Sequence, residues 1–404
     1  MKKRLAIIGA GPSALLLAAH LDSTKFEVCI YEKSKAAGRK FLVAGKGGFN
    51  LTHSEDISTF VKRYSPDSFL EKALLEFTNE DLRQWLESIG IATFIGSSKR
   101  VYPLLGIKPI TVLKQILKTL EDRGVVLNFE QEWLGWMANN ELKFYDGKED
   151  KIKVVEADYT VFAMGGGSWK VTGSDGGWRN LFSEKGIVTK EFRGVNCAYE
   201  VNWPSDFVDL YAGQPIKNLA VRCGGLIQKG EAVVTAFGLE GNAIYGLSPE
   251  IEKEFANRGV AKVFLDFKPM FSVAEVKRKL VKSKDRKRTD LLRNTLKLSK
   301  VQVAIIKAVL SKEEFTGDLE QLSKLIKLTQ VAFKSSAPLD EAISTIGGIS
   351  IEELSQNFEL KKMKNSFCIG EMVDWNAPTG GYLLQACFSM GVALAKQFNE
   401  QAKK

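Results

Sequence analysis

The chain has 404 residues, of which 45% are hydrophobic and 26% charged, as in a soluble globular protein of two or three domains. Its net charge of +9 fits a solvated surface, but also an anionic cofactor, a nucleic acid or an anionic membrane as a partner. Two histidines and five widely spaced cysteines exclude a multi-histidine metal site and a C-x-x-C redox centre, so we expect no metal and a reducing compartment.

The N-terminal segment resembles a signal peptide, because Lys2, Lys3 and Arg4 precede an apolar run. Gly9 and the following Gly-Pro pair interrupt that run, which favours a buried strand, a tight turn and the start of a helix. Elsewhere no uninterrupted apolar run approaches the roughly 18 residues of a membrane span. We therefore expect a cytoplasmic protein without a membrane segment.

The hydrophobic pattern predicts a strand at 4–8, a helix at 13–21 and a strand at 26–31, which together form a β-α-β unit with parallel strands. Amphipathic helices are predicted at 67–90 and 108–123, and strands at 124–130 and 159–164. Short β-rich runs fill 193–265. Helical spacing follows over 272–330, where Ser272 and Glu275 form a capping box. A strand, a glycine turn and a helix return after about 366.

This order predicts an α/β protein with a discontinuous Rossmann-like domain into which other domains are inserted. The predicted boundaries are 1–190 and 345–404 for the dinucleotide-binding domain, 191–268 and 331–344 for a β-rich inserted domain, and 269–330 for a small helical domain.

The segment GAGPSA at 9–14 matches the G-x-G-x-x-G/A fingerprint of dinucleotide-binding folds. Gly9 permits the tight turn, Gly11 lets a pyrophosphate approach the backbone, and Ala14 allows close packing of helix and strand. Pro12 suits the first helical turn, whose free N–H groups attract phosphate. Glu32 ends the second strand, where its carboxylate can accept hydrogen bonds from ribose hydroxyls.

The residues after Glu32 distinguish FAD from NAD. Lys33 and the Gly38-Arg39-Lys40 sequence give the arrangement E-K-x(4)-G-R, which is typical of FAD-binding proteins with this fold. The segment GRKFLVAGKGGFN at 38–50 is not a P-loop, because its Gly-Lys pair is followed by glycine rather than serine or threonine. We expect it to cross an extended FAD instead.

Three blocks resemble the aminoacetone-oxidase-like family of bacterial flavoproteins: GAGPSA at 9–14, GRKFLVAGKGGFNLTH at 38–53 and GEMVDWNAPTGGYLLQACFSMG at 370–391. The segments FAMGGGSW at 162–169, FGLEGNAIYGLSPE at 237–250 and TIGGIS at 345–350 fit as well. The resemblance implies an FAD domain interrupted by a β-rich and a helical domain, and a redox flavoenzyme.

The same resemblance implies a non-covalent FAD site. Its residues would be Gly9, Gly11, Pro12, Ser13 and Ala14 in the turn, Glu32 and Lys33 near the ribose, Arg39 and Lys40 near the phosphates, Gly45, Lys46, Gly47, Gly48 and Asn50 near the ribityl chain or the flavin, Gly165 after the strand at 159–164, Gly370, Glu371 and Asp374 near the second phosphate, and Gly380, Gly381, Tyr382 and Leu383 at the flavin N1/O2 edge.

Two positions depart from the commonest family pattern. Many members have Arg-Cys-Asn in place of Gly48-Phe49-Asn50, and Asn in place of Leu383. The chain therefore resembles a divergent branch, and its substrate is not transferred from the family name. The aromatic and basic side chains that could line the substrate face, or else pack in the core, are Lys46, His53, Trp169, Tyr245 and Tyr382.

The leading hypothesis is an FAD-dependent oxidoreductase of a small molecule, either an amine or a conjugated ketone. NAD(P)H could be the electron donor, although no second G-x-G-x-x-G follows a strand. The basic run KRKLVKSKDRKRTDLLRNTLKLSK at 277–300 supports an alternative, an FAD-containing protein that binds or modifies RNA. Because the run has no aromatic residue for base stacking, we favour a solvated or interface-facing helix with one apolar face.

Overall fold

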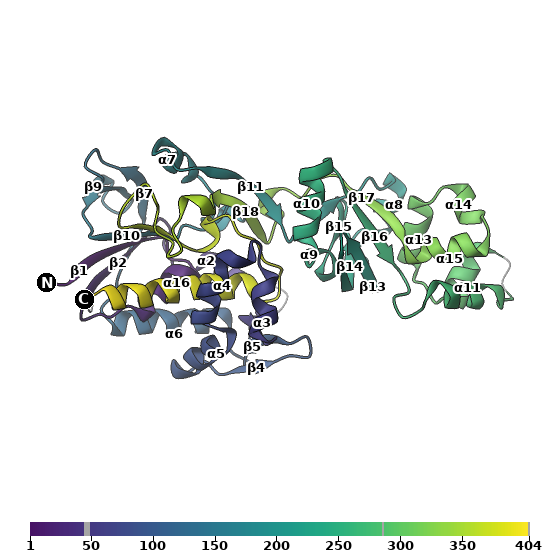
Figure 1. Cartoon of the computed structure of the whole chain (residues 1–404), viewed down its shortest axis with the longest axis horizontal. Coiled ribbons are helices and arrows are strands. Elements are labelled where there is room, and N and C mark those ends of the chain that lie inside the picture. Colours follow the sequence, from purple (N-terminus) through teal and green to yellow (C-terminus); the bar gives the residue numbers. More distant parts are fainter. Residues whose placement is uncertain (44–48, 285–286, 403–404) are drawn as a thin grey trace. The chain divides into compact units, whose positions relative to one another are not determined.

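The structure is a computed structural model that describes residues 1–43, 49–284 and 287–402. The chain divides into two compact units (Figure 1). Unit 1 comprises 1–193 and 343–404, and unit 2 comprises 194–342.

Unit 1 is built around a parallel five-stranded sheet. Its strand order is β19-β10-β1-β2-β6, and each neighbouring pair is parallel. The sheet strands are β1 (Lys3–Ile8), β2 (Phe26–Glu32), β6 (Val126–Phe129), β10 (Tyr159–Phe162) and β19 (Ser366–Cys368). The predicted Rossmann-like α/β fold is thus confirmed, and its last strand comes from the C-terminal segment.

Aromatic side chains show what covers the two faces of this sheet. On one face, Phe26 and Phe367 contact Phe398 of the long helix α16 (Tyr382–Gln401), which also packs along α1 (Pro12–His20). On the other face, Tyr31 stacks on Phe144 of a small antiparallel sheet. That sheet comprises β7 (Gln131–Trp136), β8 (Leu142–Asp146) and β9 (Lys151–Val155).

The remaining elements of unit 1 flank this layered core (Figure 1). They are α2 (Arg39–Val43), β3 (Thr52–His53), α3 (Ile57–Phe60), α4 (Asp67–Glu76), α5 (Asn79–Ser88), β4 (Thr93–Ile95), β5 (Arg100–Pro103), α6 (Pro109–Asp122), α7 (Arg179–Glu184), β11 (Thr189–Val195) and β18 (Ser344–Ile349).

The prediction of one helix over 67–90 is wrong, because the chain breaks between α4 and α5. Phe77 has an extended backbone, and Thr78 forms a capping box with Asp81 that starts α5. The carbonyl of Phe77, released from the helical pattern, accepts hydrogen bonds from Gln385 and Ser389 of α16. The break therefore anchors this segment to the C-terminal helix.

His20, at the end of α1, is held against aromatic rings and has a titration that can be tested. Its Nδ1 lies 2.9 Å from the Leu16 carbonyl oxygen, and its ring contacts Phe77 and Trp85. Burial lowers the pKa of His20 from 6.5 to about 4. Because the unfolded chain keeps the ordinary pKa, it binds more protons below pH 6.5. The stability that the neutral, buried His20 side chain contributes is therefore present above pH 6.5 and is lost as the pH falls toward 4.

We therefore expect the wild type to lose roughly 2.5 kcal/mol more of its unfolding free energy than His20→Gln between pH 7 and pH 4.5. Urea denaturation of both proteins at the two pH values measures this difference. An equal loss in the two proteins would contradict the titration of His20.

Unit 2 contains an antiparallel sheet and a set of helices that share one hydrophobic core. The strand order is β12-β15-β14-β13-β16-β17. Helical residues such as Leu280, Ile305 and Ile326 belong to the same buried cluster as Val221 and Val263 of the sheet. We therefore describe the helices of 269–330, predicted as a domain of their own, as part of this unit.

The elements of unit 2 have the following bounds: β12 (Tyr199–Glu200), α8 (Ser205–Tyr211), β13 (Pro215–Cys223), β14 (Leu226–Val234), β15 (Gly238–Glu240), α9 (Asn242–Tyr245), α10 (Ser248–Arg258), β16 (Ala261–Asp266), α11 (Val273–Val281), α12 (Arg288–Asp290), α13 (Lys300–Val309), α14 (Lys312–Thr316), α15 (Leu319–Lys327) and β17 (Thr329–Phe333).

The capping box predicted from Ser272 and Glu275 is present at the start of α11. The expectation of a single helix over the basic run 277–300 is wrong, because α11 ends at Val281 and α13 begins only at Lys300. Between them lie the short helix α12 and a π-helical turn at Leu291–Thr295.

Candidate functional site

The glycine turn after β1 is shaped by its two glycines in different ways. Gly9 has φ +96°, and a Cβ atom there would lie 2.5 Å from the Ala163 carbonyl oxygen. Among the described residues, a Cβ atom on Gly11 would meet only that oxygen, at 3.9 Å. Gly9 is therefore required by the fold itself, whereas the space beside Gly11 is open to an incoming group.

Glu32 holds this turn from the end of the neighbouring strand. Its carboxylate accepts hydrogen bonds from the Ala10 N–H at 2.9 Å and from the Ser34 N–H at 2.8 Å. The carboxylate thereby joins β2 to the glycine turn at the carboxyl edge of the sheet, where ligands bind in open α/β sheets.

Helix α1 begins at this turn with a free N-terminus. Pro12 occupies the first helical turn, and the N-cap residue Gly11 makes no side-chain cap hydrogen bond. Ser13 and Ala14 follow, both buried. The positive end of the helix dipole therefore faces the open space beside Gly11, as a phosphate requires.

Lys33, predicted near the ribose, and Arg39, predicted near the phosphates, are both bound to the loop that follows β10. Lys33 forms an ion pair with Asp175 at 2.7 Å, and Arg39 donates to the Val171 carbonyl oxygen at 2.8 Å. Both side chains are therefore held by contacts within the protein.

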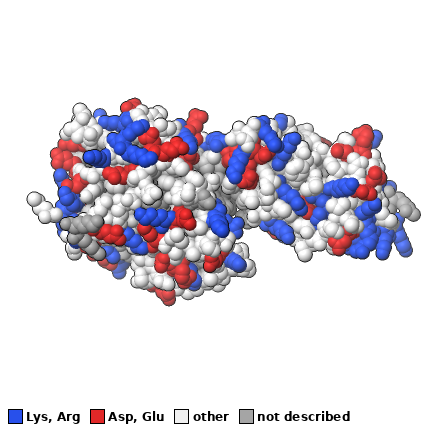
Figure 2. Space-filling model, viewed as in Figure 1, with Lys and Arg blue, Asp and Glu red and all other residues white. Residues whose placement is uncertain are grey.

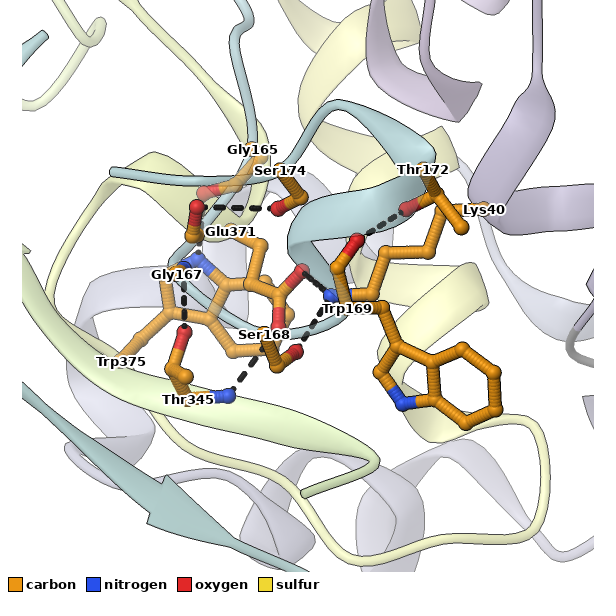
Figure 3. A network of polar contacts seen from close by, with 12 residues as sticks. Lys40, Gly165, Gly167, Ser168, Trp169, Thr172, Ser174, Thr345, Glu371 and Trp375 are labelled. Carbon is orange, nitrogen blue, oxygen red and sulfur yellow. Dashed lines mark hydrogen bonds and ion pairs between the residues drawn. The ribbon is translucent and has the colours of Figure 1, made fainter. Parts of the chain in front are cut away.

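Lys40 and Glu371, 331 positions apart in sequence, form the centre of a polar network (Figure 3). The Lys40 ammonium donates to Glu371 Oε2 at 2.8 Å and to the Ser168 hydroxyl at 2.7 Å. The other oxygen of Glu371 accepts from the Thr345 N–H, and the Thr345 hydroxyl accepts from the Gly167 N–H, both at 3.1 Å. The network joins α2, the loop after β10, β18 and the turn at 370–372.

The glycine loop after β10 is held by further hydrogen bonds, of which the one from Ser174 is drawn in Figure 3. Gly165 has φ +76°, and its carbonyl accepts a hydrogen bond from the Trp178 indole. Ser174 donates to the carbonyl of Gly166. Trp169 has a left-handed backbone with φ 60°, which is uncommon for a large residue, and its indole points away from the Lys40–Glu371 pair.

The Gly-acid segment at 370–374 packs directly against the start of α1. Gly370 has φ +80°, and a Cβ atom on it would lie 2.6 Å from the Ser13 hydroxyl. Asp374 is occupied by other contacts, since it accepts from the Gly347 N–H and pairs with Lys190 at 2.7 Å.

Helix α16 also begins at a pair of glycines, and its N-cap residue Gly381 makes no side-chain cap hydrogen bond. Gly380 and Gly381 have φ values of +113° and +104°, and a Cβ atom on Gly381 would lie 2.5 Å from the Thr52 backbone. Tyr382 and Leu383 form the first turn of the helix. The Thr52 hydroxyl beside it is buried and lacks a hydrogen-bond partner among the described residues.

Tyr382 also belongs to a cluster of polar side chains. Its hydroxyl donates to Glu55 Oε1 at 2.6 Å, and both oxygens of Glu55 accept from Arg63. The ring of His53 stacks on Tyr382 with a centroid separation of 5.2 Å. The structure therefore brings together His53 and Tyr382, two of the predicted substrate-face residues.

The titrating groups of this cluster influence one another. Burial lowers the pKa of His53 and raises that of Tyr382. Burial alone would raise the pKa of Glu55, but the hydrogen bonds from Arg63 and Tyr382 outweigh it and lower that pKa. The cluster therefore presents a neutral phenol bound to an ionised carboxylate.

Several predicted residues lie elsewhere. Gly45, Lys46, Gly47 and Gly48 lie outside the described residues. Asn50 is partly buried next to them. Tyr245 belongs to α9 of unit 2, where its hydroxyl donates to Glu240 at 3.4 Å.

The residues of unit 1 fit a dinucleotide. An open glycine cradle, an acid at the tip of β2 and the helix starts at Gly11 and Gly381 are features that suit one, and the buried Thr52 hydroxyl has no hydrogen-bond partner among the described residues. In the described part of the chain, no group of three or more His, Cys, Asp or Glu side chains could hold a metal ion.

Four residues of the site were missed by sequence reasoning: Thr52, Glu55, Ser168 and Thr345. Three of them lie within or directly after segments singled out for their glycines, so proximity to those motifs was a usable signal. Glu55 carries no such signal, because its contacts with Arg63 and Tyr382 arise only from the fold.

Comparison with known proteins agrees with this architecture. A family model described as the HI0933-like protein Rossmann domain matches residues 3–397. The 3-dehydro-bile acid delta(4,6)-reductase of Clostridium scindens is 23% identical over 96% of this chain and 97% of its own length. The ribosomal RNA dihydrouridine synthase of Haemophilus influenzae is 21% identical over 98% of each chain.

Among solved structures, the open conformation of a flavocytochrome c3 fumarate reductase matches with a TM-score of 0.50 and 13% identity, covering 100% of this chain and 79% of the other. This likeness concerns the fold. In the described residues, no helix combines the length and the apolar character needed to cross a bilayer.

The narrower resemblance to aminoacetone-oxidase-like proteins stays a prediction. The match over 3–397 shows that the chain belongs to the HI0933-like family.

Proposed function

We propose that unit 1 binds FAD non-covalently across the carboxyl edge of its parallel sheet. The open space beside Gly11 supports a pyrophosphate there, and Glu32 supports a ribose next to it. The uncapped start of α16 supports the flavin edge at Tyr382. The other residues proposed for the site are Gly9, Pro12, Ser13, Ala14, Lys33, Arg39, Lys40, Asn50, Gly165, Gly370, Glu371, Gly380, Gly381 and Leu383, with Asp374 in reserve.

We propose that the reaction is the reduction of a carbon–carbon double bond conjugated to a carbonyl group, with a small molecule as substrate. One observation carries this proposal: the names of the two relatives, each of which aligns over nearly the whole chain, describe the same type of reaction. One is named for reducing delta(4,6) double bonds of a 3-dehydro compound, and the other for making dihydrouridine. Both names describe saturation of an alkene in conjugation with a carbonyl, which favours a conjugated ketone over an amine.

The residues of this chain would position the reactants. When bound and reduced, FAD would supply the hydride and a proton from solvent would complete the saturation, with NAD(P)H as our proposed donor of electrons to the flavin. The N–H groups that open α16 stabilise negative charge at the flavin edge. Tyr382 keeps its proton on the hydroxyl, directed at Glu55, and Arg63 keeps Glu55 ionised.

All five cysteines are free thiols, which supports a reducing cytoplasm as the place of action.

Anaerobic stopped-flow spectroscopy tests the reaction. The flavin is photoreduced and then mixed with a 4,6-dien-3-one steroid, cyclohexenone or uridine, and in a separate run the oxidised flavin is mixed with aminoacetone. We expect a conjugated ketone to restore the oxidised flavin spectrum with formation of its saturated product, while cyclohexanone, the matched saturated ketone, leaves the spectrum unchanged. Reoxidation by none of the conjugated compounds would contradict the proposal, as would reduction of the flavin by aminoacetone alone.

A second candidate is the same reduction carried out on a uracil base of RNA. Uracil contains a carbon–carbon double bond conjugated to a carbonyl, and the relative from Haemophilus influenzae is named as a ribosomal RNA dihydrouridine synthase. Mass spectrometry of RNA treated with the reduced protein tests this candidate, since each saturated uridine gains about two mass units from two hydrogen atoms.

A further inference from the structure

Unit 2 carries a surface of unusual composition between α11 and α13. In the described residues from Lys282 to Lys300, every exposed side chain is a cation or a neutral hydrogen-bonding group. We call this surface the basic ridge, and its members are Lys282, Lys284, Lys287, Arg293, Asn294, Lys297, Ser299 and Lys300. Figure 2 shows Lys and Arg side chains gathered at the part of unit 2 where Figure 1 labels α11.

The backbone beneath the basic ridge is held in place by its own apolar residues. The leucines of this segment, Leu291, Leu292, Leu296 and Leu298, are buried in the core of unit 2. The Ser283 and Thr295 hydroxyls lie 2.7 Å apart and join the two arms of the segment. Because the apolar side chains all point inward, the cations are displayed together on a surface that is already ordered.

The cations of the basic ridge are not used within the protein. None of the six forms an ion pair or a side-chain hydrogen bond among the described residues, whereas neighbouring cations do. Lys277 pairs with Glu320, and Arg288 donates to the Thr316 and Gly317 carbonyl oxygens. Within the described residues of the segment from Lys282 to Lys300, Asp290 is the one acidic residue. The ridge thus holds an excess of at least five positive charges that repel one another unless an anion binds.

We propose that the basic ridge is a docking surface for the phosphate backbone of double-helical RNA. Membrane insertion would need exposed apolar residues, and single-stranded RNA would need aromatic residues for stacking. The exposed ridge residues offer neither. Lysine and arginine contact phosphates, and Asn294 and Ser299 add groups that can bond to phosphate and 2′-hydroxyl oxygens, as duplex RNA presents them.

The inference concerns the second candidate function, but it rests on the charge and composition of the basic ridge and does not require flavin chemistry. RNA binding by the ridge and turnover at unit 1 are measured separately. A protein that binds RNA but reduces no uracil would leave the docking surface intact and refute the second candidate.

Fluorescence anisotropy of the full-length flavoprotein with an RNA duplex of about 20 base pairs tests the ridge. For six phosphate contacts, the affinity should fall about a thousandfold between about 50 and 200 mM salt, and only about tenfold after four are removed. The ridge variant combines Lys282→Gln, Lys284→Gln, Arg293→Gln and Lys297→Gln. The matched control neutralises four exposed lysines of unit 1 and should keep the steep dependence: Lys114→Gln, Lys118→Gln, Lys148→Gln and Lys364→Gln.

Three outcomes would overturn the proposal. Equal salt dependence in the ridge variant and the control would show that the ridge does not contact RNA. We expect a DNA duplex of the same sequence to bind at least about tenfold more weakly, because it lacks the 2′-hydroxyl groups. A DNA affinity within tenfold of the RNA affinity would show that the surface is not specific for RNA. Ridge-dependent binding to phosphatidylglycerol vesicles, in the absence of RNA binding, would assign it to membranes. Circular dichroism of the ridge variant verifies that it is folded.

Discussion

Gly11→Glu should abolish FAD binding without unfolding the protein. The new carboxylate would extend into the open space that we assign to the pyrophosphate, where repulsion between charges about 4 Å apart amounts to about 4 kcal/mol even at an effective dielectric constant of 20. We therefore expect the affinity for FAD to fall more than about a hundredfold. The apoprotein should keep its melting temperature, because a Cβ atom at this position meets only the Ala163 carbonyl oxygen, at 3.9 Å.

Gly225→Glu is the matched control for this experiment. Gly225 is an exposed glycine of unit 2, and a Cβ atom on it has no neighbour within 4 Å. Titration of each apoprotein with FAD, followed by flavin fluorescence, and thermal melting measure the two effects. Retention of FAD by Gly11→Glu would refute the assignment of the glycine turn.

Gly391→Ala should destabilise unit 1, although the same change in an ordinary helix is favourable by about 1 kcal/mol. Gly391 lies where α16 crosses α1. A Cβ atom there would overlap the Ser13 carbonyl oxygen and lie 3.0 Å from the Leu17 nitrogen. Both atoms belong to the backbone of a buried helix and cannot move aside by a rotamer change. We expect a loss of about 2–3 kcal/mol and a fall in melting temperature of about 5–10 °C.

Glu400→Ala, an exposed position on the same helix, should leave the melting temperature almost unchanged. Calorimetry of both variants makes the comparison. An unchanged or raised melting temperature in Gly391→Ala would show that α1 and α16 can separate at no cost, contrary to the close crossing described above. Because Ser13 also belongs to the proposed cofactor turn, we expect the same variant to hold FAD more weakly.

The sequence contained enough information to predict the parallel sheet and the position of the glycine turn. Those features depend on short-range patterns, namely an apolar strand, glycines at fixed spacing and an acid at the next strand end. Glu32 illustrates the point, since its contact with Ala10 follows from the β-α-β geometry itself.

Contacts between distant segments could not be predicted in the same way. Lys40 was expected near phosphates, and only the fold shows that its ammonium meets Glu371 and Ser168. The break between α4 and α5 has a similar cause, since the Phe77 carbonyl bonds to side chains of α16 that lie more than 300 positions away. A capping box at Thr78 was the local signal for that break, but helical periodicity on both sides outweighed it.

The basic run shows how periodicity can mislead. Its leucines recur at helical spacing, yet the chain uses them to close a compact turn onto the core of unit 2. The local pattern fixed which residues are buried, whereas the path of the backbone depended on neighbours supplied by the rest of the unit.

The placement of β19 and α16 has a consequence for the order in which the protein can fold. A chain that has been synthesised only to residue 193 contains β1, β2, β6 and β10 with the glycine turn, but neither the edge strand β19 nor the helix that covers α1. Unit 2 is continuous in sequence and is complete at residue 342. We therefore expect unit 2 to mature on the ribosome before unit 1, whose apolar helix α1 must wait for the last residues of the chain and is exposed to chaperones until then.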